Sequence, residues 1–246
     1  MKALTKKLLA LGASSLIAVT GGYLIDPWEG KRNDAYKDIV GVYTICYGET
    51  KGVKIGDYRT DEQCDESLVN ELTSYNSAMR KYVKVGLKPY EEIAYTSFVW
   101  NLGETNFKNS TLLRKLNAGD KVGACNALLS WNKVTVSGSE VSSYLKRGET
   151  CTPLDNGKYS CTVKGLTNRR THEHTVCMGK DSAVNAAIKE LEADEKPLQA
   201  PESVIPSLPP KQEEINDSAP PLLANDIPLV SEECRWKIFK ICLKRK

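Results

Sequence analysis

Apolar residues recur at helical spacing through most of the chain after residue 60. The run Thr60-Asp61-Glu62-Gln63 has the form of a capping box, which begins a helix. Apolar side chains then follow at spacings of four, four and seven, which places them on one side of that helix. They are Cys64, Leu68, Leu72 and Met79. Start and stop signals predict further helices near Pro89, Ser110, Asp120, Thr167 and Asp181. The helix after Asp120 is expected to bury Val122, Leu128, Leu129 and Trp131.

Two earlier segments alternate apolar and polar residues as strands do. Residues 35–38 and 42–47 flank Gly41, which predicts a β-hairpin. Asp26-Pro27 is expected to open a short helix just before the hairpin, because proline is favoured in the first helical turn. Small strands followed by many helices predict an α+β fold.

Residues 132–164 interrupt the helical pattern and have the composition of an insertion. Within them, residues 151–161 predict a hairpin around Asn156-Gly157, closed by a disulfide between Cys151 and Cys161. The insertion either lines a binding cleft or only decorates the surface.

The N-terminal residues have the pattern of a weak membrane helix. Three lysines precede residues 8–25, eighteen residues without a charge, which is barely enough to span a bilayer. The lysines favour a cytoplasmic N-terminus. Glycines and hydroxyl residues, including Gly21-Gly22, interrupt the apolar run. A cleavable secretion signal is the alternative interpretation.

Charge is distributed unevenly behind a net charge of +3. Residues 190–233 hold 2 lysines and 11 acidic residues, and residues 195–231 hold 8 of the 11 prolines, so residues 195–233 are expected to form an extended, disordered linker. Residues 234–246 are cationic and amphipathic, which predicts binding to anionic lipid or lipopolysaccharide rather than to nucleic acid. This tail is either a helix or a disulfide loop, since helical geometry would hold Cys234 and Cys242 too far apart to bond. It is either native or an engineered addition.

Eight cysteines indicate an oxidising compartment rather than the cytosol. Their order suggests four pairs: Cys46 with Cys64, Cys125 with Cys177, Cys151 with Cys161, and Cys234 with Cys242. No C-x-x-C pair is present, and His172 and His174 point to different faces of a helix, so the sequence predicts no metal and no cofactor.

The candidate chemistry lies in three residues near the hairpin. Glu29 is followed by Asp38 nine residues later and by Thr44 six residues after that. Cleavage of a glycosidic bond needs one protonated carboxyl group and one ionised carboxylate, and a threonine hydroxyl can hold the water. The alternative is that both carboxylates lie on the surface beside the hairpin.

This spacing, E-x8-D-x5-T, resembles the signature of the phage-type lysozymes, glycoside hydrolase family twenty-four. The blocks S-F-V-W-N-L-G-E-T-N-F (residues 97–107) and G-L-T-N-R-R (residues 165–170) are similar to the family as well. The resemblance implies a two-lobed lysozyme fold, in which a small β-hairpin lobe with the catalytic helix joins a mostly helical lobe.

The resemblance also implies roles for single residues. Glu29 would be the general acid, Asp38 the ionised partner and Thr44 the residue that positions water. Trp100 and Asn101 would face the cleft and bind substrate, although a packed, buried Trp100 is the alternative. Arg169 and Arg170 would orient the two lobes by pairing with carboxylates.

The family likeness extends to lambdoid phage endolysins of the signal-arrest-release type. It implies an enzyme that hydrolyses the β-1,4 bond between N-acetylmuramic acid and N-acetylglucosamine of peptidoglycan and lyses the host cell. Residues 1–25 would anchor the chain in the inner membrane and keep it silent until release to the periplasm. The catalytic domain would then be residues 26–194. The alternatives are a lytic transglycosylase, a cell-wall-binding protein of the same fold without chemistry, and a protein that disrupts membranes through residues 234–246.

Overall fold

The computed structural model describes residues 1–38 and 41–194, and the linker, the tail and the predicted Cys234–Cys242 bond lie outside this part. In chain order the elements are α1 (Ala3–Ala10), α2 (Ser15–Val19), the π-helical η1 (Thr20–Ile25), β1 (Arg32–Lys37), β2 (Tyr43–Cys46), α3 (Asp61–Arg80), α4 (Pro89–Leu102), α5 (Glu104–Lys108), α6 (Thr111–Asn117), α7 (Lys121–Ala127), the 3₁₀ turn η2 (Leu128–Ser130), β3 (Lys133–Val136), α8 (Gly138–Leu145), β4 (Thr150–Pro153), β5 (Tyr159–Thr162), α9 (Lys164–Cys177) and α10 (Ser182–Asp194). Small sheets and many helices make this an α+β fold, as the sequence predicts.

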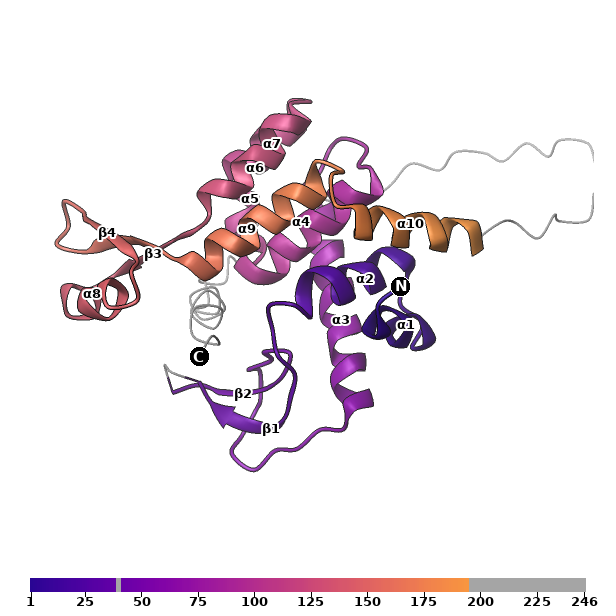
Figure 1. Cartoon of the computed structure of the whole chain (residues 1–246), viewed down its shortest axis with the longest axis horizontal. Coiled ribbons are helices and arrows are strands. Elements are labelled where there is room, and N and C mark those ends of the chain that lie inside the picture. The colour runs from indigo at the N-terminus through magenta and orange to yellow at the C-terminus, as the bar shows by residue number, and fades with distance from the viewer. Residues whose placement is uncertain (39–40, 195–246) are drawn as a thin grey trace, which may run out of the picture.

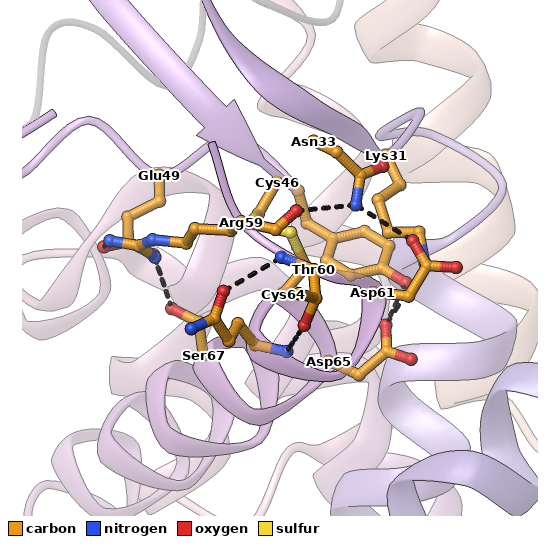
Figure 2. The surroundings of a disulfide bond; sticks show 12 residues. Lys31, Asn33, Cys46, Glu49, Arg59, Thr60, Asp61, Cys64, Asp65 and Ser67 are labelled. Carbon is orange, nitrogen blue, oxygen red and sulfur yellow. Dashed lines mark hydrogen bonds and ion pairs between the residues drawn. A yellow bond between two sulfur atoms is a disulfide. The ribbon is translucent and has the colours of Figure 1, made fainter. Parts of the chain in front are cut away.

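The hairpin lobe is fastened to the first turns of α3. Strands β1 and β2 pair antiparallel, with Tyr36 opposite Thr44. The predicted Cys46–Cys64 disulfide is confirmed, with a Cα–Cα distance of 5.1 Å. Figure 2 shows polar contacts around it, among them the ion pair between Arg59 and Glu49 at 2.5 Å. Helix α3 runs from this lobe into the helical lobe and so joins the two (Figure 1).

Helix α4 lies at the centre of the helical lobe. Every residue from Glu91 to Leu102 is buried, which explains why the sequence lacks a polar face there. Helices α3 and α9 pack against α4. The predicted disulfide between Cys125 and Cys177 is confirmed and connects α7 to the end of α9, with a Cα–Cα distance of 5.7 Å.

Two local predictions in the helical lobe are wrong. Val122 is 57% exposed and Leu129 is also exposed, whereas Leu128 is buried. The α7 segment is short, so only one narrow stripe of it can face the core. The helix expected to start at Thr167 starts at Lys164, and the Thr167 hydroxyl donates to the carbonyl of Val163 inside the first turn.

The N-terminal segment differs most from expectation. The sequence predicts one membrane helix over residues 8–25, but the structure folds them into α1, α2 and η1, which pack on one another and on α3 and α4. Leu8, Ile17 and Ile25 are buried in the same apolar cluster as Ile45 of β2 and Leu68 of α3. Among residues 1–38 and 41–194, no helix has the length and apolar character needed to cross a bilayer.

Two glycines make this packing possible. A Cβ added at Gly21 would collide with Leu8, and one added at Gly22 would collide with the Thr5 hydroxyl and lie 3.1 Å from the Thr5 backbone nitrogen. Helices α1 and η1 therefore approach each other more closely than any larger residue would allow.

The insertion is a small folded unit rather than an irregular loop. Its three strands pair antiparallel in the order β3-β5-β4, and the predicted Cys151–Cys161 disulfide joins β4 to β5. Its apolar residues, among them Val134 and Tyr144, form a separate cluster that also contains Leu166 of α9. In Figure 1 this unit projects from the N-terminal end of α9.

Candidate active site

Glu29 lies in a bend that follows η1, at the junction of the two lobes. Its backbone N–H donates to the carbonyl of Ile25, so Asp26-Pro27 lies in a turn that ends a helix and does not open one. Glu29 is buried, with only 7% of its side chain exposed. Its Oε1 lies 3.1 Å from Nη1 of Arg169 on α9. The position of this carboxyl group therefore depends on both the N-terminal segment and α9.

A buried network of charges continues from Glu29 through α9. Arg169 Nε and Arg170 Nη2 both donate to Glu173 Oε1 at 3.2 Å. Arg170 Nη2 also donates to Asn101 Oδ1 at 2.7 Å, which connects α9 to α4. The pKa of Arg170 is lowered to about 10, mainly by burial; Glu173 opposes this change and Arg169 adds to it. Arg170 thus remains charged at neutral pH, and the prediction that both arginines pair with carboxylates is confirmed.

Asp38 and Thr44 lie together on the hairpin. The backbone N–H of Val42 donates to Asp38 Oδ1 at 2.9 Å, and the Asp38 N–H donates back to the Val42 carbonyl. The Thr44 side chain is buried, and its hydroxyl donates to the Val42 carbonyl at 3.3 Å. Hydrogen bonds to the backbone of Val42 therefore fix the orientation of both the Asp38 carboxylate and the Thr44 hydroxyl.

Tyr36 lies within electrostatic reach of both carboxylates. Burial is the main reason why the pKa of the Tyr36 phenol is raised, and the charge of Glu29 and then that of Asp38 raise it further, while Arg32 lowers it. Tyr36 also pairs with Thr44 across the hairpin. The charges of the predicted acid and of its predicted partner therefore both act on Tyr36, and the predicted water-positioning residue is its cross-strand partner.

Trp100 and Asn101 are buried on α4, with exposures of 2% and 1%. The indole Nε1 of Trp100 donates to Glu71 Oε2 at 3.1 Å, and the Arg169 guanidinium lies 5.4 Å from its ring centroid. Asn101 accepts the hydrogen bond from Arg170. Contact of either residue with substrate stays a prediction.

Known proteins resemble this chain over its catalytic region. The family described as phage lysozyme matches residues 26–150, about half of the chain. The chain belongs to the phage lysozyme family. The SAR-endolysin of Enterobacteria phage P21 is 38% identical over 167 residues, 68% of this chain and 87% of the relative. The SAR-endolysin of Bacteriophage PS119 is 37% identical over 167 residues, 68% of this chain and 84% of the relative.

A solved structure agrees with the sequence relatives. The endolysin from Escherichia coli O157:H7 phage FAHEc1 has a TM-score of 0.54 and 30% identity, covering 69% of this chain and 94% of that one. This phage lysozyme is accordingly a glycoside hydrolase of the muramidase type, as the sequence predicts.

Sequence reasoning missed one member of the site in this phage lysozyme. Glu173 stands between His172 and His174, and the sequence motifs assign it no role. Its spacing carried a usable signal: residues three and four apart on a helix are neighbours, and Glu173 follows Arg170 by three and Arg169 by four. The structure shows both pairs, with all three side chains fully buried.

Proposed function

We propose that this chain is an endolysin that hydrolyses the β-1,4 bond between N-acetylmuramic acid and N-acetylglucosamine of peptidoglycan, and so lyses the host cell. The observation that carries the proposal is the placement of Glu29: a buried carboxyl group at the lobe junction, held by Arg169, with Tyr36 near both it and Asp38.

The residues divide the chemistry between them. Glu29 gives its proton to the leaving oxygen of the glycosidic bond. Asp38, oriented by the Val42 N–H, remains ionised and stabilises the positive charge that develops on the sugar or activates water. The Thr44 oxygen keeps lone pairs available to accept from that water, because its own proton is directed to the Val42 carbonyl. Asn101 and Trp100 support this site through Arg170 and Arg169, and substrate contact by either remains part of the proposal.

Product analysis tests the bond and the reaction type. Purified peptidoglycan digested by the full chain should yield fragments with reducing N-acetylmuramic acid ends, each heavier by one water molecule than an anhydro end. Mass spectrometry distinguishes the two products. Anhydro ends would assign the chain to the lytic transglycosylases, and reducing N-acetylglucosamine ends would show that a different bond is cut.

We also propose that residues 8–25 first lie in the inner membrane, with the N-terminus in the cytoplasm, and that the enzyme is later released to the periplasm. Two relatives of this chain carry the name SAR-endolysin, and Lys2, Lys6 and Lys7 suit a cytoplasmic end. The support from packing is that Leu8, Ile17 and Ile25 contribute to the core of the folded enzyme. A chain that holds these side chains in lipid lacks part of that core and the support beneath Glu29, so it should be silent.

For residues 234–246 we propose attachment to anionic lipid or lipopolysaccharide. Deletion of this tail should leave the rate of digestion of purified peptidoglycan unchanged and should weaken binding to vesicles that contain anionic lipid, because the deleted residues carry 6 basic side chains. Co-sedimentation with vesicles measures the second effect. Loss of cell lysis, while purified peptidoglycan is still digested, would instead make membrane disruption by the tail the main activity.

A further inference from the structure

Glu173 is a fully buried carboxylate to which the mechanism above gives no task. Its Oε1 accepts three hydrogen bonds: from Ser97 Oγ on α4 at 2.8 Å, from Arg169 Nε at 3.2 Å and from Arg170 Nη2 at 3.2 Å. One oxygen atom therefore joins the central helix to both guanidinium groups of α9.

Glu173 supplies negative charge directly beside two buried guanidinium groups. Arg169 and Arg170 are adjacent in sequence, fully buried, and each carries a positive charge. Their negative partners are Glu173 and Glu29. A general acid must be protonated before it reacts, so in the reactive enzyme Glu173 is the one negative charge in this group of four. Isolated buried charges are costly, which makes this carboxylate essential to keeping two guanidinium groups in place.

We propose that Glu173 is a positioning residue for the catalytic acid: it holds the Arg169 guanidinium so that Nη1, rather than Nε, faces Glu29. A guanidinium presents its donors in a rigid planar fork, so fixing Nε on Glu173 also fixes where Nη1 points. Arg169 in turn sets the position of Glu29 Oε1. This inference depends on the proposed role of Glu29 as the acid.

The substitution Glu173→Gln tests it, because glutamine keeps the shape and the acceptor oxygen but removes the charge. Loss of a nearby negative charge favours ionisation of the remaining acid, and an ionised Glu29 cannot donate. The alkaline limb of the pH profile of kcat/KM should therefore move to lower pH by about one unit. Misplacement of the acid should lower kcat by roughly 10- to 100-fold, with KM little changed because Glu173 is buried away from solvent.

The other ionisable groups near Glu29 do not produce the same shift. Tyr36 and Asp38 lie on the hairpin side, and Glu71 bonds to Trp100 on the α4 side. All three remain unchanged in the variant. A shift in the profile would then report the loss of the Glu173 charge.

A matched control is Glu92→Gln. Glu92 is also buried and accepts from an arginine, Arg80, at 2.7 Å, but it lies near the start of α4, about 12 Å along the helix from Trp100. This variant should lose stability in denaturant unfolding yet keep the pH profile of kcat/KM. Equal profiles for Glu173→Gln and the unmodified protein would overturn the inference, as would an equal shift in the control.

Ser97→Ala provides a second test if the Glu173 variant fails to fold. It removes one hydrogen bond to Glu173 and no charge, so kcat should fall on the order of 5-fold while the pH profile stays in place. An unchanged kcat would overturn the inference. The Glu29→Gln variant distinguishes failure of this inference from failure of the proposed function. If only the inference is wrong, Glu29→Gln is inactive and the Glu173 and Ser97 variants are normal. If the proposed function is wrong, Glu29→Gln itself remains active.

Discussion

Glu29→Gln should reduce the rate of peptidoglycan hydrolysis by about 100- to 10,000-fold, the range that a general acid contributes. Glutamine fits the same space and can still accept from Arg169, but it has no proton of suitable acidity for the leaving oxygen. The loss should appear in kcat at every pH, since no titration restores the missing acid. The release of reducing ends from purified peptidoglycan measures it.

The same substitution separates an enzyme from a wall-binding protein of the same fold. Sedimentation with peptidoglycan should be retained in Glu29→Gln, because the change leaves the surface of the molecule almost unaltered. Asp26→Asn is a suitable control: Asp26 is exposed and lies three residues earlier, so this variant should hydrolyse at the normal rate. A folded Glu29→Gln protein with normal hydrolysis would refute the assignment of the acid.

Local signals in the sequence predicted much of the fold. The capping box at Thr60 is present, and the four apolar residues that follow it are all buried. Three of the disulfides that the order of the cysteines suggested are confirmed. The spacing of Glu29, Asp38 and Thr44 led to the family, which the comparisons confirm.

Other features of the fold depend on contacts between segments that are distant in the sequence, so local sequence patterns could not predict them. An uncharged stretch such as residues 8–25 suits lipid and a protein core equally well, and composition alone does not choose between them. The exposure of Val122 follows from how α7 meets its neighbours rather than from its own pattern. Likewise, the hydrogen bond from Ser97 to Glu173 joins residues 76 positions apart.

The ambiguity of residues 8–25 leads to the second prediction, that Gly22→Leu should leave the chain membrane-bound and silent. In the folded enzyme a side chain at position 22 would collide with Thr5. The Cβ alone would lie 3.1 Å from the Thr5 backbone nitrogen, and the remaining leucine atoms would need further space. Overpacking of this kind costs about 3 kcal/mol. That is a large part of the 5–15 kcal/mol that typically holds a domain folded. In lipid the same change is favourable by about 0.5 kcal/mol, so both effects oppose release.

Ala10→Leu isolates the packing effect from the gain in apolar character. Ala10 lies in the same segment but is exposed in the folded enzyme, so leucine there adds similar apolar surface without a collision. After the membrane potential is dissipated, cells that express Ala10→Leu should lyse, and the protein should appear in the periplasmic fraction. Cells that express Gly22→Leu should remain intact, with the protein in the membrane fraction. Retention of both variants would mean that apolarity alone controls release, and lysis by both would mean that the close approach of α1 and η1 is not needed for activity.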